Sequence, residues 1–436
     1  MTGAAAADIT GDLLSLAAAP APDVARAVMR LSLLDWAGCA LAGRNEAVAR
    51  LLRAQVADAA GGSGAVTVIG GGRAAPAQAA LVGGATSHAL DYDDTHFAHI
   101  GHPSVAVLPA ALAVAEARGR DLDAMCDAAL RGAEASVRAG LWLGRGHYQQ
   151  GFHQTATAGS FGAALAAGLL MGLGAERLRT ALGLASTLAS GLKNQFGTMG
   201  KPLNAGLAAR AGVEAAQWAA AGMSSADDGL AGPQGFGETH HGAAAAVPPA
   251  PGGGWWIERV SHKFHACCHG LHAAIEALNT LRGPDPDAVA RVIIATHPRW
   301  LRVCNIVAPR SGLECKFSYT QVAAMSLTGR DTAAVGSFDD ACAADPVLTA
   351  LRARVEVVGD DTLAETQARV VVHGRDGAQR TARHDIAEPL PLDDRQARVE
   401  AKCAALTGSR TAAQLDAALR AGDLPGLCAL LGEPAG

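Results

Sequence analysis

The chain has 436 residues, half of them apolar but only 4% aromatic, and a formal net charge of −5. This length is enough for two domains, and a core filled by small side chains favours closely packed helices over a β-sandwich. The acidic balance gives no basic surface and so argues against a nucleic-acid partner.

The cysteine usage and the N-terminal charges indicate a cytoplasmic protein. The nine cysteines form no CxxC pair, and Cys267 and Cys268 are adjacent, which suits a reducing compartment. Asp8 and Asp12 stand where an export signal carries basic residues. The uncharged stretch 154–175 is rich in Gly and Ala, so we expect a buried helix there and no membrane span.

The first half of the chain predicts an antiparallel helical bundle. Apolar residues recur at helical spacing, with short polar or Gly-containing loops between the segments. A short strand is expected at 65–69, and Asp91–Pro103 is expected to be an irregular loop because Pro103 disfavours helix just before it. The expected helices are 22–43, 75–90, 104–118, 121–143, 155–172, 176–191 and 204–222.

The second half predicts a mixed domain. The composition shifts to Gly, Pro and Ala over 229–254, and beyond it helical and strand-like segments alternate. The expected fold is mainly α: a large helical domain over 1–261, completed by 403–436, and a smaller α+β lid domain over 262–402. The expected elements are helices 265–282 and 314–328, strands 289–295, 354–358, 368–372 and 379–383, and Ala/Leu helices over 394–431.

The loop 91–103 is dense in acids and imidazoles. Acids beside His side chains suit proton transfer, since a carboxylate fixes the tautomer and raises the pKa of the imidazole. His102, held by Asp91, is the candidate proton-transfer group, and the carboxylate favours its role as the general acid. Two alternatives remain: the acids cap the helix that begins near Ser104, or the loop binds a metal ion. The possible metal ligands are Asp91, Asp93, His96, His99 and His102.

Two further polar segments precede expected helices. His153 lies in GFHQTAT, at the start of the uncharged helix. Lys193 and Lys201 lie in KNQFGTMGKPLN, in a chain with only five lysines against 31 arginines. Amides, glycines and two lysines close together are typical of an anion-binding loop, to which a helix N-terminus would add free N–H groups.

Histidines also gather at 262–272. His265, His269 and His272 are spaced to share one face of a helix, a rare pattern for a purely structural face. Metal-free packing is the alternative. The segment Lys316–Gln321, KFSYTQ, is a weaker polar candidate.

Together, in this order, the motifs DYDDT…HPS, GFHxTxT, KxxFGTMxKP, KFHACCxxxH and KFSYTQ resemble the MmgE/PrpD family. That family includes 2-methylcitrate dehydratases, cis-aconitate decarboxylases and iminodisuccinate epimerases. The resemblance implies a homodimer with a site in a cleft between a helical domain and a lid. It implies catalytic roles for His102, Asp91, His153, Lys263, Cys268 and His269. It implies substrate binding by Thr95, Lys193, Lys201, His272, Lys316 and Gln321.

Two departures from the decarboxylase pattern affect the choice of reaction. One extra residue separates Thr95 from His102, and Cys268 stands where decarboxylases place a second acid–base His, with His269 next to it. We therefore predict a lyase of the 2-methylcitrate dehydratase type, acting on a small di- or tricarboxylate. No GxGxxG motif joins a strand to a helix, and no zinc motif such as HExxH is present, so neither a cofactor nor a metal is expected.

Several alternatives to the dehydratase remain open. Within the family these are an epimerase or isomerase of a dicarboxylate such as iminodisuccinate, with Cys268 as one of two bases, and a decarboxylase of the cis-aconitate type. From another class, a metal-dependent hydrolase would use the Asp/His loop. A polyanion-binding protein without catalysis is the last alternative.

Overall fold

The fold is described from a computed structural model, which covers residues 8–57, 65–243, 245–281 and 286–434. The chain divides into two compact units, one of residues 1–262 with 399–436 and one of residues 263–398. The sequence had placed the boundaries at 261/262 and 402/403.

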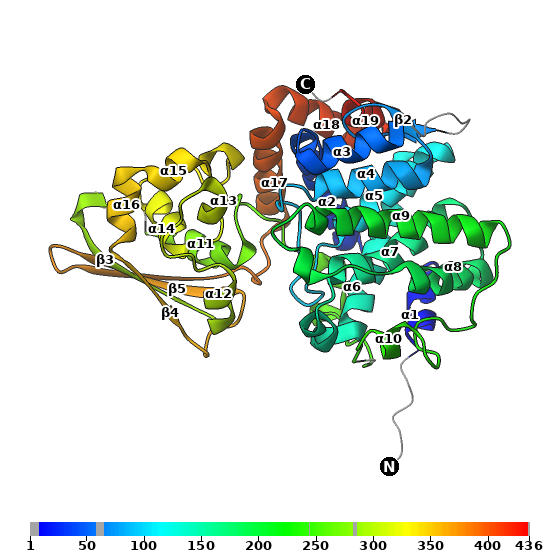
Figure 1. The fold of residues 1–436 in the computed structure, drawn as a ribbon, viewed down its shortest axis with the longest axis horizontal. Helices are drawn as coiled ribbons and strands as arrows, with labels where there is room; N and C mark the ends of the chain where they lie inside the picture. Colours follow the sequence, from blue (N-terminus) through cyan, green and yellow to red (C-terminus); the bar gives the residue numbers. More distant parts are fainter. Residues whose placement is uncertain (1–7, 58–64, 244, 282–285, 435–436) are drawn as a thin grey trace, which may run out of the picture. The chain divides into compact units, whose positions relative to one another are not determined.

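The first unit is a helical bundle built around α7 (Figure 1). α7 packs against α5, α6, α8 and α9, and Gln154–Gly168 is buried along its whole length. α6 is interrupted at Gly144, whose φ of 72° breaks the helix. The helices of this part are α1 (Ile9–Ser15), α2 (Asp23–Gly43), α3 (Ala47–Ala57), α4 (Pro76–Ser87), α5 (Ser104–Ala117), α6 (Leu122–Gln150), α7 (Gln154–Leu170), α8 (Ala175–Leu188), α9 (Gly200–Ala220) and α10 (Phe236–Thr239). A small hairpin, β1 (Val66–Thr67) and β2 (Arg73–Ala74), joins α3 to α4.

Helices α4 and α9 approach each other at backbone contact distance. A Cβ added at Gly84 would lie 2.8 Å from the Gly206 Cα, and one added at Gly206 would overlap the carbonyl oxygen of Leu81. Interiors packed this closely leave no room for an extra methyl group. Because His88 follows α4 and Lys201 lies in the first turn of α9, this contact brings two polar side chains of the bundle together.

The C-terminal helices complete the first unit. α18 (Ser409–Ala421) and α19 (Leu424–Leu431) pack against α2, and Figure 1 shows them beside it. In α17 (Leu392–Thr407), Lys402 is buried against Asp35 of α2. Residues 399–436 thus group with the helical unit, where the Ala/Leu pattern had led us to expect them.

The second unit is α+β. Its sheet has the order β4-β3-β5-β6, with β3 and β4 parallel and the other pairs antiparallel. α11 packs on β5 and β6, and α14 on β4, so helices cover one face of the sheet (Figure 1). The strands are β3 (Val289–Thr296), β4 (Val355–Gly359), β5 (Gln367–Gly374) and β6 (Gln379–Asp385). The helices are α11 (His272–Thr280), α12 (Pro298–Val303), α13 (Gly312–Cys315), α14 (Tyr319–Leu327), α15 (Asp340–Ala344) and α16 (Pro346–Arg352).

Several predicted helices have different bounds, and the one expected at 121–143 extends to Gln150. Helix 265–282 is wrong at its start, because residues 265–268 are irregular, a 3₁₀ turn follows at His269–Leu271, and α11 begins at His272. Helix 314–328 is two helices, since Ser318 caps a new one by accepting a hydrogen bond from the Gln321 amide. The helix expected at 204–222 begins at Gly200.

None of the described helices combines the length and hydropathy that a membrane crossing requires.

We predict that Gly206→Ala destabilises the protein. The new methyl group would collide with the Leu81 carbonyl in α4, and overpacking of this kind costs about 1–3 kcal/mol in the free energy of unfolding. Urea unfolding would measure this. The matched control is Gly146→Ala, an exposed helical glycine whose added Cβ would lie 3.6 Å from its nearest neighbour, the His241 carbonyl oxygen. Equal stability of both variants would contradict the close approach.

Candidate functional site

The acidic loop between α4 and α5 is held by backbone hydrogen bonds. The Asp91 amide donates to the His88 carbonyl, and Thr95 exchanges two backbone hydrogen bonds with Ser261. Asp91 has a φ of 51°, in the left-handed region, which costs a non-glycine residue about 1–2 kcal/mol. Such strained residues persist where the surrounding structure holds them, often at functional sites.

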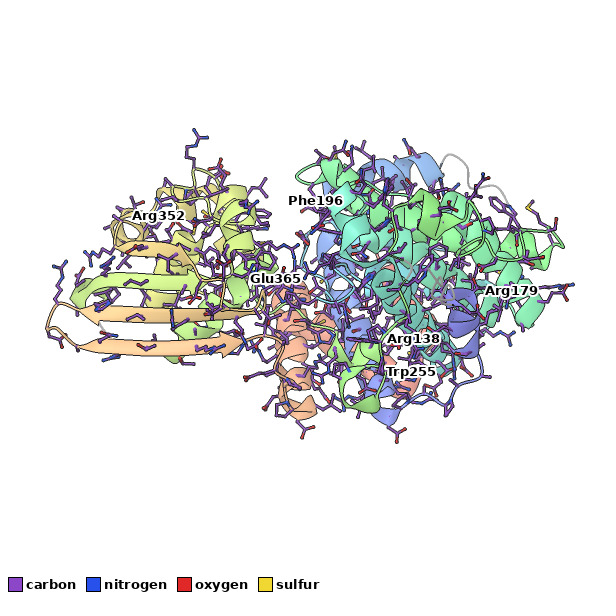
Figure 2. The ribbon with its side chains drawn as sticks, turned by 90° about the horizontal axis from the view of Figure 1, so that it is seen from below. Arg138, Arg179, Phe196, Trp255, Arg352 and Glu365 are labelled. Atoms are coloured by element: carbon purple, nitrogen blue, oxygen red, sulfur yellow. The ribbon has the colours of Figure 1, made fainter. Side chains whose placement is uncertain are left out.

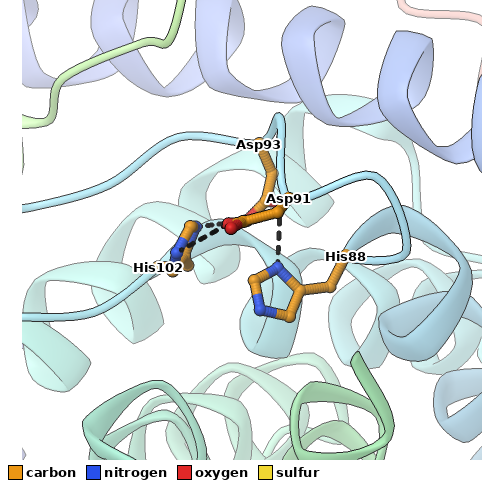
Figure 3. Close-up of side chains that lie close together, drawn as sticks. All are labelled: His88, Asp91, Asp93 and His102. Carbon is orange, nitrogen blue, oxygen red and sulfur yellow. Dashed lines mark hydrogen bonds and ion pairs between the residues drawn. The ribbon is translucent and has the colours of Figure 1, made fainter. Parts of the chain in front are cut away.

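Asp93 is fully buried and lies between two imidazoles (Figure 3). The Nδ1 of His88 is 2.9 Å from Oδ1 of Asp93, in hydrogen-bonding geometry. The Nδ1 of His102 is 2.7 Å from Oδ2, within ion-pair distance, although the angle at the ring N–H falls short of a good hydrogen bond. The two rings meet edge to face, with centroids 4.5 Å apart. One carboxylate therefore orients both imidazoles.

Asp91 faces the same imidazole from its other side. Its Oδ1 is 3.5 Å from Nε2 of His102, and its Oδ2 forms an ion pair of 2.7 Å with the Lys201 ammonium. The Asp91 side chain is 34% exposed and that of Lys201 is 17% exposed, so solvent reaches this end of the cluster. The prediction that Asp91 holds His102 is corrected: the nearer carboxylate is Asp93, and Asp91 lies between His102 and a cation.

His153 completes the cluster. It precedes α7, is 2% exposed, and its ring stacks over that of His88 at 6.1 Å between centroids. Asn204 of α9 donates from Nδ2 to Nδ1 of His153 at 3.2 Å. Phe196, labelled in Figure 2, packs edge-on against the His153 ring and lies 5.4 Å from the Lys201 ammonium. Aromatic and amide contacts thus fix this imidazole.

These contacts favour opposite tautomers of His102 and His153. Because Asp93 Oδ2 lies 2.7 Å from Nδ1 of His102 whereas Asp91 Oδ1 lies 3.5 Å from Nε2, we expect the neutral ring to carry its proton on Nδ1 and a lone pair on Nε2. Because Asn204 donates to Nδ1 of His153, that ring carries its proton on Nε2. The site therefore offers one base and one hydrogen-bond donor.

Burial keeps the imidazoles neutral. Desolvation lowers the pKa of His102 to about 4, although Asp93 acts in the opposite direction, and it lowers the pKa of His153 well below its ordinary value. The pKa of Asp93 is held well below its usual range by His102 and His88, which outweigh its own burial. The predicted rise in the pKa of His102 is therefore wrong, and His102 is a base near neutrality.

The same cluster offers donor atoms to a metal ion. One atom each from His88, Asp91, Asp93 and His102 lies within 4.8 Å of the others. However, both Nδ1 atoms face the Asp93 carboxylate, and Asp91 is paired with Lys201. An ion would have to displace the ammonium and break these contacts, so the donors fit a hydrogen-bonded network better. Of the ligands predicted from sequence, His96 bonds to the Trp256 carbonyl and His99 is buried elsewhere.

The remaining predicted residues of the first unit have structural contacts. Thr95 is paired with Ser261 through its backbone. The Lys193 ammonium donates to the Tyr148 carbonyl at 2.8 Å and lies over the Tyr148 ring at 3.7 Å. Lys193 thus has hydrogen-bonding and cation–π contacts within the bundle, unlike Lys201, whose contact is a carboxylate.

In the second unit the predicted His cluster forms, but without a shared helix face. His265 lies before the helix, yet its ring packs edge-on against His272 at 5.0 Å, and His269 lies 4.5 Å from His272. His265 is held by Thr332 and Glu276. Burial lowers the pKa of His272 well below its ordinary value, so this ring is neutral.

The other predicted residues of this unit differ in exposure. Lys263 is 2% exposed, whereas Cys268 is partly exposed, and the amide of Cys268 donates to the Lys316 carbonyl. Gln321 is fully buried, and its side-chain amide contacts Arg352 and Cys342. Those contacts make Gln321 part of the core of this unit.

Three residues of the cluster are not among the catalytic or substrate-binding residues predicted from the sequence. His88, which caps the C-terminus of α4, lies three residues before Asp91, and Asp93 is predicted only as a metal ligand. Asn204 was read as a helix start. Their signal was present, since His88 and Asp93 flank Asp91 in HALDYDD. Their roles, however, depend on which side of the loop each side chain faces.

A carboxylate–imidazole cluster beside a lysine, in a helical bundle that is joined to an α+β unit, is typical of enzymes that transfer protons. Family models agree with this class: the MmgE/PrpD N-terminal domain matches residues 8–248, and the MmgE/PrpD C-terminal domain matches residues 265–421. The chain belongs to the MmgE/PrpD family.

Curated relatives are cis-aconitate decarboxylases. The chain is 28% identical to the one from Homo sapiens over 349 residues, which are 74% of this chain and 71% of that protein. It is 30% identical to the one from Aspergillus terreus over 52% of this chain and 50% of that protein. It is 31% identical to the cis-aconitate decarboxylase-like protein oryM of Aspergillus oryzae, over 59% and 57% of the two. The two fungal matches thus span about half of their proteins.

We predict that His102→Asn lowers kcat by about 10²–10⁴, because the amide keeps a polar group but cannot accept and release a proton near neutrality. In the wild type the base is unprotonated above its lowered pKa of about 4. The rate kcat/KM should therefore stay level from pH 8 to about 5 and fall only on approach to that pKa. If His102→Asn kept a near-normal kcat and an unchanged pH profile, another group would have to be the base.

We predict that activity survives EDTA and dialysis, because the donor atoms of the cluster are engaged with one another and with Lys201. Elemental analysis of the purified protein should find well below one equivalent of transition metal. Stoichiometric Zn or Mn, with activity lost on chelation and restored by the ion, would reverse this prediction and support the hydrolase alternative.

Proposed function

We propose that the protein is a lyase that removes water from a small di- or tricarboxylate. The observation that carries the proposal is a pair of contacts: Asp93 lies at Nδ1 of His102, which favours a lone pair on Nε2, and Asn204 lies at Nδ1 of His153, which favours an N–H on Nε2. Elimination of water needs both a base for a carbon-bound proton and a donor for the leaving hydroxyl group.

The base acts at a carbon next to a carboxylate. As His102 takes the proton from that carbon, negative charge builds up on the neighbouring carboxylate, and a preorganised cation stabilises it. Lys201 is the cation of the first unit that lies closest to this chemistry, through Asp91. The carbon–oxygen bond then breaks while the N–H of His153 donates a hydrogen bond to the hydroxyl group. The hydroxyl group takes the proton that His102 had removed, water leaves, a carbon–carbon double bond is formed and His102 is neutral again.

The ion pair between Lys201 and Asp91 indicates how a substrate is recognised. In the free protein the Asp91 carboxylate forms an ion pair of 2.7 Å with the Lys201 ammonium, and the Asp91 side chain is partly exposed. A substrate carboxylate can take the place of this internal anion. A compact ammonium suits such an exchange better than a guanidinium, which binds carboxylates in a fixed fork.

Decarboxylation is the second candidate, and the relatives named cis-aconitate decarboxylases favour it. That reaction needs a proton delivered to carbon and a carboxylate placed to leave as CO₂. The neutral, unprotonated Nε2 of His102 favours proton abstraction instead, which is also how an epimerase begins. Dehydration, decarboxylation and epimerisation would all use the same anion-binding residues, so only their products distinguish them.

The experiment is a substrate screen in deuterated water, followed by NMR. Citrate, 2-methylcitrate, cis-aconitate, tartrate and iminodisuccinate are each incubated with the protein. Dehydration gives an unsaturated acid, with deuterium entering the substrate next to a carboxylate, whereas decarboxylation releases CO₂ and epimerisation exchanges deuterium without a new double bond. Binding of these anions by thermal shift, with neither exchange nor product, would contradict the proposal and support a non-catalytic polyanion-binding protein.

We predict that Lys201→Ala raises KM and lowers kcat/KM, by about 2–5 kcal/mol in transition-state stabilisation if the substrate pair is shielded from water. Lys201→Arg should rescue poorly because its planar fork does not fit a point-charge site. Steady-state kinetics with the substrate found in the screen would measure both.

The matched comparison is Lys193→Ala in the same segment. The Lys193 ammonium contacts the Tyr148 carbonyl and ring, so its loss should lower thermal stability and leave KM near the wild-type value. If Lys201→Ala had wild-type kinetics, or if KM rose more in Lys193→Ala, Lys201 would not be the residue that binds the substrate anion.

A further inference from the structure

Lys402 is the one lysine that lies outside the sequence motifs, and it is almost completely buried. Its side chain, in α17, is 2% exposed, and its ammonium contacts Asp35 of α2 at 2.6 Å. The ammonium also donates to the Tyr92 carbonyl at 2.5 Å and lies over the Tyr92 ring at 4.1 Å. The cation thus joins two helices to the acidic loop.

Burial of an ammonium is costly unless partners compensate for the lost hydration. Here Asp35 compensates most, and the nearby Asp93 acts in the same direction, so the pKa of Lys402 is raised despite its burial. The thiol of Cys39, which also faces the ammonium, has a raised pKa because of its own burial and is therefore neutral. The Lys402 ammonium is therefore charged near neutral pH.

The carbonyl that Lys402 holds lies between the two carboxylates of the site. Tyr92 separates Asp91 from Asp93, and its carbonyl belongs to the peptide group that leads into Asp93. We propose that Lys402, with Asp35, is a positioning residue, which fixes the Tyr92 peptide so that Asp93 faces His102 and Asp91 faces Lys201. Lys402 touches no reacting atom and acts through the loop.

The next residue of the loop is fixed in a similar way. Asp94 is 1% exposed and accepts hydrogen bonds from the Ser104 amide and hydroxyl. Burial raises the pKa of Asp94 to about 7, partly offset by Ser104 and with Asp35 and Asp93 adding to the rise. A third anion beside Asp35 and Asp93 is therefore disfavoured, and the single charge of Lys402 offsets part of the charge of those two.

The alternative is that Lys402 and Asp35 serve stability alone. A buried ion pair of that kind can be replaced by apolar residues of similar volume with little loss of stability. If Lys402 positions the loop, such a replacement should instead keep the fold but change the tautomer of His102. The test variants are Lys402→Met, Lys402→Arg and the double variant Lys402→Met with Asp35→Leu, which leaves no unpaired buried charge.

The first readout is ¹⁵N NMR of the histidine rings at pH 7, with the His102 signals identified by their loss in His102→Gln. In the wild type we expect the Nδ1–H tautomer of His102 to dominate. In the double variant and in Lys402→Arg we expect a mixture of both tautomers, because Asp93 no longer faces Nδ1. A wild-type tautomer in a folded double variant would overturn the proposal, and if Lys402→Met fails to fold, the other two variants decide.

The control is Arg131→Met. The Arg131 side chain is 11% exposed, and it binds the Asp127 carboxylate and the carbonyls of Leu16 and Ala19, so it is a similar buried clamp. Those contacts lie outside the acidic loop. We expect a lower melting temperature in Arg131→Met with the His102 tautomer unchanged. The same tautomer change in this control would show a general effect of destabilisation and overturn the proposal.

The second readout rests on the proposed function. With the substrate found in the screen, kcat of the double variant should fall by about 10–100-fold, as expected for misplaced catalytic groups, while KM changes little. A rise of KM with unchanged kcat would overturn the positioning role. Because the tautomer is measured without turnover, a protein that converts none of the tested acids would fail the proposed function and still test this inference.

Discussion

The buried carboxylate of Asp93 is the interaction on which the site depends. It lies between His88 and His102, within 2.9 Å of a ring nitrogen on each side. A carboxylate buried so completely stays charged only if its surroundings compensate for lost hydration, and here two imidazoles and the nearby Lys402 do so. The carboxylate in turn decides which nitrogen of His102 is free to accept a proton.

The packing of the bundle makes this cluster possible. Ala and Gly fill the interior, so helices approach closely enough to place side chains from several of them around one point. The contact of Gly84 with Gly206 brings α4 and α9 together, and these helices carry His88 and Lys201. Larger residues at this contact would separate the ends of the cluster. The small-residue composition is therefore a requirement of the site as well as of the core.

The electrostatic arrangement has two layers. An inner layer, in which the Asp93 carboxylate lies between the imidazoles of His88 and His102, is buried, whereas the ion pair of Asp91 and Lys201 is partly open to water. A substrate anion can therefore compete for Lys201 without disturbing the tautomer of His102. In the proposed function, proton transfer by His102 and anion binding by Lys201 are thus tasks of different residues.

The sequence by itself determined the fold class, the family and the segments of the site. Helical periodicity, the Pro103 boundary and the return of the C-terminal helices follow from local patterns that a chain carries wherever it folds. The motifs also identified His102, His153 and Lys201 as members of a polar site. The tertiary structure decided which atoms face one another: Asp93 is nearer to His102 than Asp91 is, Lys193 contacts Tyr148, and the Lys402 ammonium donates to the Tyr92 carbonyl 310 residues away. It also reversed the expected pKa shift of His102, because the direction depends on burial, which no local pattern of residues specifies.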